Sequence, residues 1–183
     1  MRAMNISETF FMVENENDAQ SRNWSFRAPV AKDGLAVNKL IESAEPLDDN
    51  SAYCNFLQVT HFRETSLAAY YRGELAGFIS AYLKPNVPKT LFIWQVVVGK
   101  GFRGQGIAKK MLNKLLERQN LRRLKAIETT ITKNNKASWA LFNGVEKEHG
   151  EKSVVSVFLD RDIHFDGQHD TEYLYRISLK KNQ

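Results

Sequence analysis

The middle of the chain carries four closely spaced glycines between an apolar run and an amphipathic stretch. Leu91–Val98 is rich in β-branched and aromatic residues, which is typical of a strand buried on both faces. The glycines follow at Gly99, Gly101, Gly104 and Gly106. One apolar stripe at helical spacing then comprises Ile107, Ala108, Met111, Leu112, Leu115 and Leu116. A strand, a glycine turn and a helix N-terminus together present backbone N–H groups to an anion, so this region predicts a phosphate-binding site.

Two well-known phosphate-binding loops do not describe this region. A P-loop requires Lys and then Ser or Thr at the end of its glycine run, whereas Ile107–Ala108 follows Gly106. The dinucleotide pattern Gly-x-Gly-x-x-Gly can be placed on 99–104, but that register puts Arg103 inside the turn. The residues therefore indicate a phosphate loop of another kind.

The periodicity of the chain indicates the elements that must position this turn. We expect strands over 24–27, 65–71, 75–83, 91–98, 125–131, 153–158 and 172–179. We expect helices from Leu35 to before Pro46, from about Asp48 through Phe62, over 104–118 and over 135–148. Arg72-Gly73-Glu74 predicts a hairpin turn. The last two strands are separated by a long polar loop, and such loops are usually functional or mobile.

The glycine region resembles the acetyl-CoA loop of a known superfamily. Arg103-x-x-Gly106-x-Ala108 and, about thirty residues later, Asn135-x-x-Ser138-x-x-Leu141-Phe142 resemble the two cofactor motifs of the GNAT superfamily of N-acetyltransferases. The resemblance implies an α/β fold, a central twisted mixed β-sheet with helices on both faces. It implies acetyl-CoA as cosubstrate, bound by Val96, Val98, Arg103, Gly104, Gln105, Gly106, Ile107, Ala108 and Asn135. In that reading, backbone N–H groups of Val96 and Val98 hold the acetyl carbonyl and the pantetheine arm.

Four further stretches narrow the resemblance. They are Leu47-Asp48-x-Asn50-Ser51-x-Tyr53-Cys54, Phe92-Ile93-Trp94-Gln95-Val96, Glu128-x-Thr130-Ile131-Thr132 and Gly167-x-His169-x-x-Glu172-x-x-Tyr175-Arg176-Ile177. Over about residues 24–179 the chain is similar to the L-2,4-diaminobutyrate acetyltransferases of ectoine synthesis, although Gln168 stands where that family has a first histidine. The implied reaction transfers acetyl to the γ-amine of L-2,4-diaminobutyrate. The alternatives are an acetyltransferase for another amine or a protein N-terminus, and a non-catalytic acyl-CoA-binding or nucleic-acid-binding module.

The implied reaction needs a base and a proton donor. A free alkylamine has a pKa near ~10, so it must lose a proton before it attacks. Glu128 is the first candidate for the base, through water; it is alternatively a substrate-ammonium ligand or a solvated charge on the sheet. Phe142 stands where many superfamily members have a tyrosine that protonates the CoA thiolate. Tyr53 is the expected substitute, with a Tyr packed on its helix as the alternative.

Selection of the γ-amine requires that the other end of the substrate be held. Carboxylates can grip the α-ammonium, and Asp48 and Glu172 suit this role, with Asn50, Ser51 and His169 as hydrogen-bonding neighbours. Trp94 would contact the aliphatic chain of the substrate, or else fill the core. Residues 48–51 equally fit an ordinary helix N-cap. The two roles are compatible.

Composition and charge bound the remaining questions. At 183 residues, we expect one domain over 23–183 after a disordered polar arm over 1–22. The net charge of +5 gathers around the central helix, where it can attract CoA phosphates, form a solvated face or meet nucleic acid. Nucleic acid is disfavoured because interleaved aromatics are missing. The acidic loop matches no calcium motif, so no metal is expected. The lone Cys54 agrees with a cytoplasmic protein. Relatives suggest a homodimer.

Overall fold

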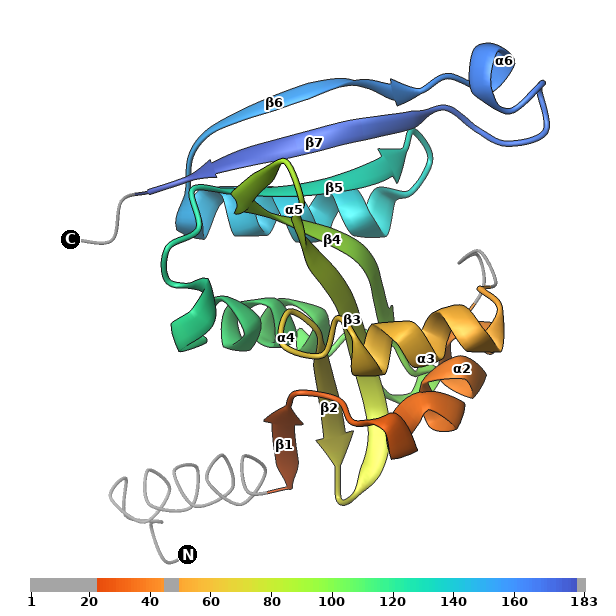
Figure 1. Cartoon of the computed structure of the whole chain (residues 1–183), viewed down its shortest axis with the longest axis vertical. Coiled ribbons are helices and arrows are strands. Elements are labelled where there is room, and N and C mark those ends of the chain that lie inside the picture. Colours follow the sequence, from red (N-terminus) through yellow and green to blue (C-terminus); the bar gives the residue numbers. More distant parts are fainter. Residues whose placement is uncertain (1–22, 45–49, 181–183) are drawn as a thin grey trace, which may run out of the picture.

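The computed structural model describes residues 23–44 and 50–180, which form one sheet with helices on both faces (Figure 1). Its strands are β1 (Trp24–Arg27), β2 (Leu67–Tyr71), β3 (Glu74–Lys84), β4 (Val87–Val98), β5 (Ala126–Thr132), β6 (Gly150–Leu159) and β7 (Glu172–Leu179). Its α-helices are α2 (Gly34–Glu42), α3 (Ala52–Thr60), α4 (Ile107–Leu116), α5 (Lys136–His149) and α6 (Arg161–His164). Short 3-10 helices are η1 (Ala31–Asp33), η2 (Lys100–Phe102) and η3 (Gln119–Leu121).

The seven strands lie in the order β1-β2-β3-β4-β5-β7-β6. Neighbours are antiparallel, except that β4 and β5 run parallel. Helix α4 connects these two strands, as a parallel connection requires. The predicted mixed sheet and its element order are confirmed. Asp48 and the expected arm over 1–22 lie outside the described residues.

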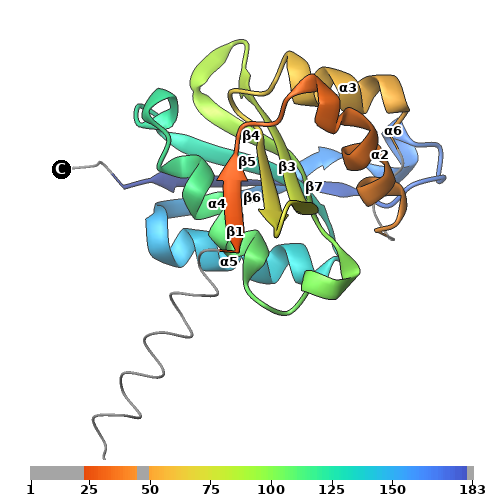
Figure 2. The same cartoon turned by 90° about the horizontal axis from the view of Figure 1, so that it is seen from below.

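Helices lie on both faces of the sheet (Figure 2), and an apolar cluster holds them to each face. The cluster under α4 and α5 includes Leu91, Ile93, Met111, Leu115, Ile127, Phe142 and Val145. The cluster under α2 and α3 includes Val37, Ile41, Val59, Phe78 and Val97. Each large side chain buried in this way contributes about 1.5–3 kcal/mol relative to exposure. The helices therefore fix the termini from which the site is built.

Two predicted helices have different boundaries from those expected. Helix α3 ends at Thr60, and Phe62 instead lies in the following turn, where its ring is 5.9 Å from that of Tyr82. Helix α4 begins at Ile107, because Gly104 and Gly106 have φ of +76° and +72°. That left-handed conformation cannot continue a right-handed helix, and glycine adopts it at little cost. The long loop also contains α6, which Asp160 caps with bonds to the N–H groups of Asp162 and Ile163.

The central strand was predicted to be buried on both faces, and this is wrong for its middle. The register with β3 shifts so that Ser80 lies opposite Gln95 and Ala81 opposite Ile93, leaving Trp94 as the extra residue of a bulge. The Trp94 side chain is 45% exposed. A bulge turns a side chain outward from a ladder, so β4 presents an aromatic ring to solvent in the middle of the sheet.

Strands β4 and β5 separate soon after they pair. Their ladder covers only Thr90–Phe92 against Ala126–Glu128, while β5 continues to pair with β7 as far as Thr132. Figure 1 shows the two strands diverging, with β5 running toward the side on which α6 lies and β4 running toward α3. The splayed strands leave backbone groups of β4 without a neighbouring strand.

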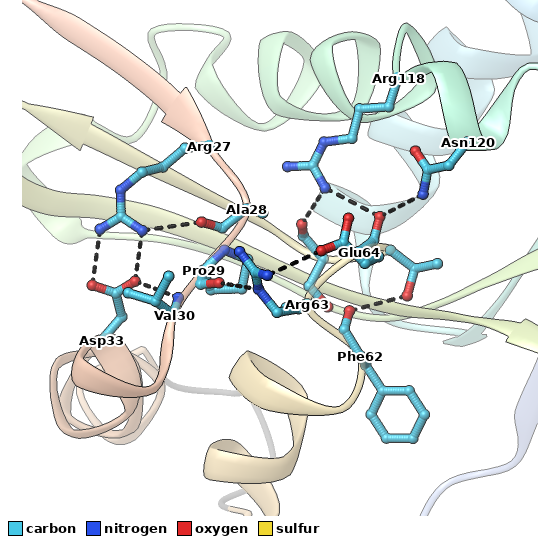
Figure 3. Close-up of polar contacts among 12 residues, drawn as sticks. Arg27, Ala28, Pro29, Val30, Asp33, Phe62, Arg63, Glu64, Arg118 and Asn120 are labelled. Carbon is cyan, nitrogen blue, oxygen red and sulfur yellow. Dashed lines mark hydrogen bonds and ion pairs between the residues drawn. The ribbon is translucent and has the colours of Figure 1, made fainter.

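Arginines fasten the segments that flank α3 (Figure 3). Arg118, just after α4, donates from Nη1 to the carbonyls of Ser66 (2.7 Å) and Glu64 (3.3 Å). Arg63 Nε donates to the Pro29 carbonyl at 3.2 Å. Burial lowers the pKa of Arg118; the charge of Glu64 opposes this, and the charge of Arg63 adds a smaller lowering. These bonds tie the α3–β2 connection to both helix layers.

Candidate active site at the splayed strands

The backbone edge of β4 that faces the splay carries N–H donors beyond the end of its ladder with β5. The Gly99 N–H donates to the Ala76 carbonyl of β3 at 2.9 Å, so Gly99 faces β3. Backbone groups of successive strand residues point to opposite edges, which turns the N–H groups of Val96 and Val98 toward the splay. The Val98 carbonyl agrees, because it accepts a hydrogen bond from Arg103 Nε at 3.0 Å. Two N–H donors therefore face the splay, and paired donors of this kind can stabilise the oxyanion of an acyl transfer.

The glycine turn forms the second part of the site. Gly104 and Gly106 take left-handed conformations, and a Cβ added at either would meet no atom within 4 Å, so backbone conformation rather than space requires glycine. The first helical bond of α4 runs from the Lys110 N–H to the Gly106 carbonyl. The N–H groups of the first turn, residues 107–109, are left for an anion. Gln105 braces the turn by donating from Nε2 to the Gly101 carbonyl at 3.1 Å.

Asn135 lies at the start of α5 and has a structural task. Its Oδ1 accepts the Ser138 N–H at 3.0 Å, which makes it the N-cap of the helix. Trp139, one residue further on, donates from Nε1 to the Thr132 carbonyl at 3.1 Å. The second cofactor motif of the sequence thus fixes the start of α5 against the end of β5.

Aromatic rings line the sheet face opposite α4 and α5. Tyr82 packs with Phe92 at 5.2 Å between ring centroids and meets Trp94 edge-on at 6.3 Å. Leu91 and Ile93 belong to the cluster under α4 and α5, so Phe92 points to the other face. An aliphatic substrate chain on this face would lie against aromatic surface.

Glu128 lies on the same face, in an ion triad. Its neighbours Ile127 and Ile131 face α4 and α5, whereas the Glu128 side chain, only 3% exposed, points to the other side of the sheet. Lys84 Nζ donates to Oε2 at 2.6 Å, and Arg176 Nη1 donates to Oε1. Lys84 and Arg176 are themselves only 33% and 39% exposed. We call these three residues the Glu128 triad.

The triad bears on the expected roles of Glu128. Burial alone would raise the pKa of Glu128, but the hydrogen bonds and charges of Lys84 and Arg176 outweigh it and lower that pKa. A weaker base with both oxygens already bonded to cations is poorly placed to take a proton from an ammonium. Of the roles considered for Glu128, the geometry favours a negative charge that orients Lys84 and Arg176, rather than a general base.

The start of α3 brings further predicted residues to the splay. Asn50 Nδ2 donates to Gln95 Oε1 at 3.0 Å, which attaches the chain before α3 to the residue after Trp94. Ser51 is the N-cap of α3, since its Oγ accepts the Cys54 N–H at 3.2 Å. The N-cap alternative is thus confirmed for Ser51. Tyr53 lies in the first turn of α3 and is 73% exposed, so its side chain is accessible to a ligand at this end of the helix.

The loop between β6 and β7 supplies the last predicted residues. Glu172 is the first residue of β7, opposite Thr132 of β5. His169 is exposed, with its ring edge-on to Phe165 at 5.2 Å. Figure 1 shows α6, which belongs to this loop, on the side of the molecule toward which β5 runs as it leaves β4. The structure thus attaches Asn50 to β4 beside Trp94, while His169 and Glu172 come from the separate connection between β6 and β7.

Sequence reasoning missed Lys84, Arg176 and Gln95 as site residues. Arg176 stands in a stretch that carried the resemblance, and its even spacing from Glu172 along a strand was the available signal, because i and i+4 share a face. Lys84 had no signal in the sequence. Within 23–44 and 50–180, no three His, Cys, Asp or Glu side chains are arranged to hold a metal ion. No helix in these ranges is long and apolar enough to cross a membrane.

Comparison with known proteins shows the family. The model of the acetyltransferase (GNAT) family matches residues 35–145. The L-2,4-diaminobutyric acid acetyltransferases of Vibrio parahaemolyticus and Vibrio cholerae are 53% identical over 160 residues and 52% identical over 159. Each alignment covers 87% of this chain, and 88% and 92% of the respective relatives. The chain belongs to the L-2,4-diaminobutyric acid acetyltransferases of the GNAT family.

A solved structure supports the same assignment. This chain is 39% identical to the diaminobutyrate acetyltransferase EctA from Paenibacillus lautus. That structure was solved in complex with its substrate L-2,4-diaminobutyric acid and coenzyme A. The TM-score is 0.82, and the match covers 87% of this chain and 97% of that chain. The predicted family, fold and cosubstrate class are confirmed.

Proposed function

We propose that this GNAT enzyme transfers acetyl from acetyl-CoA to the γ-amine of L-2,4-diaminobutyrate, giving N-γ-acetyl-diaminobutyrate for ectoine synthesis. The observation that carries the proposal is the free β4 edge beside the glycine turn, in a chain 39% identical to an enzyme solved with diaminobutyric acid and coenzyme A. No nucleic acid takes part in this reaction. The basic residues around α4 instead attract the phosphates of the cosubstrate.

The transfer takes place in a ternary complex, by direct attack. The neutral γ-nitrogen attacks the thioester carbonyl; a C–N bond forms, the C–S bond breaks, and the thiolate of CoA leaves. N–H groups of Val96 and Val98 stabilise the oxyanion and hold the pantetheine arm, and residues 103–108 bind the pyrophosphate. Free Cys54 is not on the predicted path, since the glycine turn and β4 edge bring the thioester directly to the amine.

Proton transfers accompany the attack. An alkylammonium with a pKa near ~10 is less than about 0.1% neutral at pH 7, so the site must favour the neutral amine. Tyr53 is the proposed donor of a proton to the leaving thiolate: it is exposed at the start of α3, whereas buried Phe142 has no hydroxyl to donate. Replacement of Glu128 by Gln separates the two roles considered for it: loss of a base changes the pH profile of kcat, whereas loss of a positioning charge changes KM at every pH.

The α-ammonium of the substrate is held at the opening of the splay. Asp48 and Glu172 supply the negative charge, with Asn50, Ser51 and His169 as hydrogen-bonding neighbours and Trp94 against the aliphatic chain. Asn50 and Ser51 carry structural bonds as well, to Gln95 and Cys54. Fixing the α-nitrogen in this way leaves the γ-nitrogen at the thioester.

We also propose a homodimer in the cytoplasm, the compartment that holds acetyl-CoA. Support for the dimer comes from β6, an edge strand on which Val154, Val155, Val157 and Phe158 are exposed. Edge strands with apolar surface pair readily with another chain. Light scattering after gel filtration tests this, and Val155→Lys is expected to give the monomer; a wild-type monomer at micromolar concentration would refute it.

The proposed activity is tested by CoA release with a panel of amines. We expect turnover with L-2,4-diaminobutyrate to exceed turnover with a polyamine, an aminoglycoside and a peptide N-terminus by at least about 100-fold in kcat/KM. Greater turnover with any other amine would reassign the substrate. Binding of CoA without acetyl transfer to any amine would indicate a non-catalytic module.

A further inference from the structure

The Glu128 triad has more positive than negative charge. One carboxylate bonds two cations, Lys84 Nζ at 2.6 Å and Arg176 Nη1. Lys84 and Arg176 are 33% and 39% exposed, so a further anion can reach both cations from solvent. The charge therefore points to a ligand with a negative group.

In the described part of the chain, the two sheet rows nearest to the triad carry no second carboxylate. In the sheet register, Glu128 and Arg176 lie in one row with Phe92 of β4 and Val154 of β6. The next row toward the splay contains Thr130, Leu174 and Ser156. The only additional described contact of Arg176 is a long one, from Nη1 to Thr90 Oγ1 at 3.5 Å. Among the described strands, no carboxylate in these two rows balances the second positive charge of the triad.

We infer that Lys84 and Arg176 bind the α-carboxylate of the substrate, and that Glu128 is the positioning residue that holds the two cations side by side. The inference rests on the proposed function and deepens it, since it names the group that makes an amino acid rather than a simple diamine the substrate. The contacts of Arg176 in the described part of the chain all use Nη1, which leaves Nε and Nη2 as donors. Planar guanidinium donors suit a carboxylate, and Lys84 Nζ keeps further N–H groups.

Strand β7 carries two opposite charges on one face, as an amino acid with a carboxylate and an ammonium would require. Arg176 and Glu172 are four residues apart on one strand, so their side chains leave the same face at a spacing of about 13 Å between backbones. Two long side chains of opposite charge on one face at this spacing can receive a carboxylate and an ammonium on one carbon that lies between them. Glu172 was predicted to hold the ammonium. The triad supplies the complementary end.

The triad also lies within reach of the reacting group. Glu128 is opposite Phe92, the last β4 residue in the ladder with β5. Val96 is four residues further along β4, roughly 13 Å at about 3.3 Å per residue. An Arg or Lys side chain, the short diamine and an attack distance of about 3 Å together cover this length. A carboxylate at the triad therefore leaves the γ-nitrogen near the Val96 N–H.

Glu128 acts here through its neighbours. Its depressed pKa keeps it ionised, so it separates and orients two cations that would otherwise repel each other. Glu128→Gln preserves shape and removes that charge. The expected result is a higher KM for diaminobutyrate with a much smaller change in kcat, and Glu128→Asp should restore part of the affinity.

The test compares two substrates that differ by the carboxylate, L-2,4-diaminobutyrate and 1,3-diaminopropane. We expect Arg176→Gln to lower kcat/KM for diaminobutyrate about 100-fold and Lys84→Gln to lower it about 10-fold. Turnover of 1,3-diaminopropane should stay within about threefold of wild type in both. The matched control is Lys147→Gln, an exposed cation on α5, which should change neither substrate. Circular dichroism and CoA affinity report folding.

Each outcome decides the inference. Equal losses for both substrates in Arg176→Gln and Lys84→Gln, or a wild-type enzyme that does not distinguish the substrates, would overturn it. If Arg176→Gln does not fold, Lys84→Gln alone still decides. A wild-type enzyme that acetylates a different amine and not diaminobutyrate would instead overturn the proposed function, and this result is visible before any variant is made.

Discussion

Asp33 and Glu128 are the carboxylates buried in residues 23–44 and 50–180, and each bonds an arginine, yet their surroundings differ in charge. Asp33, whose side chain is 7% exposed, bonds Arg27 through both oxygens, at 2.7 and 2.9 Å, and also accepts the Val30 N–H at 2.8 Å. Arg27 bonds the Tyr70 hydroxyl too, at 2.7 Å. One anion meets one cation, so the cluster is complete in itself.

The charges of the Glu128 triad do not balance in this way. It has two cations for one anion, and it lies on the aromatic-lined face beside the splay rather than where η1 meets β1. A balanced buried pair holds chain segments together, whereas an unbalanced one retains charge for a ligand. The comparison shows that burial alone does not identify a carboxylate as a general base. The number of cations bonded to the carboxylate indicates whether it joins chain segments or positions charge for a ligand.

Reversing one positive charge of the triad tests most strongly whether its surplus charge binds the substrate. Arg176→Glu places a second carboxylate beside Glu128 and opposite the substrate carboxylate, so kcat/KM for diaminobutyrate should fall by about 1,000-fold. Steady-state kinetics measure this, with Lys147→Glu as the control. A loss below about tenfold would show that the surplus charge has no function in binding.

The balanced cluster should respond in stability and not in catalysis. Asp33→Asn leaves Arg27 without its ion partner, and we expect a loss of about 2–3 kcal/mol in the free energy of unfolding. Urea denaturation gives this value. Folded Asp33→Asn should keep wild-type kcat/KM within about twofold, and a large loss of activity in fully folded protein would contradict the distinction between the two clusters.

The pH dependence of the unfolding free energy also tests the structural role of Asp33, with a somewhat smaller expected effect. Burial alone would raise the pKa of Asp33, but bonds from Arg27, Tyr70 and the Val30 N–H lower it from 3.8 to about 2. A carboxyl with a depressed folded pKa stabilises the protein above its unfolded pKa, and this stability is lost as pH falls. Wild type should therefore lose about 2 kcal/mol between about pH 4 and pH 2 through Asp33.

The control for that loss is the neutral variant. Unfolding free energies of wild type and Asp33→Asn, measured at intervals from pH 6 to pH 2, should converge as pH falls below about 4. A constant difference down to pH 2 would mean that Asp33 titrates normally in the folded protein. Glu128, whose pKa is also lowered, contributes loss of the same sign to both proteins.

Local patterns were sufficient to predict much of the fold and the cofactor side of the site. The glycine turn could be located because Gly104 and Gly106 interrupt two strong periodicities, and Ser51 could be recognised as a cap by residue type. The triad could not be predicted in this way, because Lys84, Glu128 and Arg176 meet only through the pairing of distant strands. A register slip of one residue would have sent Arg176 to the other face. The bulge at Trp94 likewise depends on how β3 and β4 pair, which the apolar run itself does not reveal.

The most direct test of the central claim is the identity of the acetylated nitrogen. Product made from acetyl-CoA and L-2,4-diaminobutyrate labelled with ¹⁵N at both amines should show, by NMR, an amide proton signal from the γ-nitrogen and none from the α-nitrogen. An amide at the α-nitrogen, or no acetylated product in the presence of folded enzyme, would contradict the account.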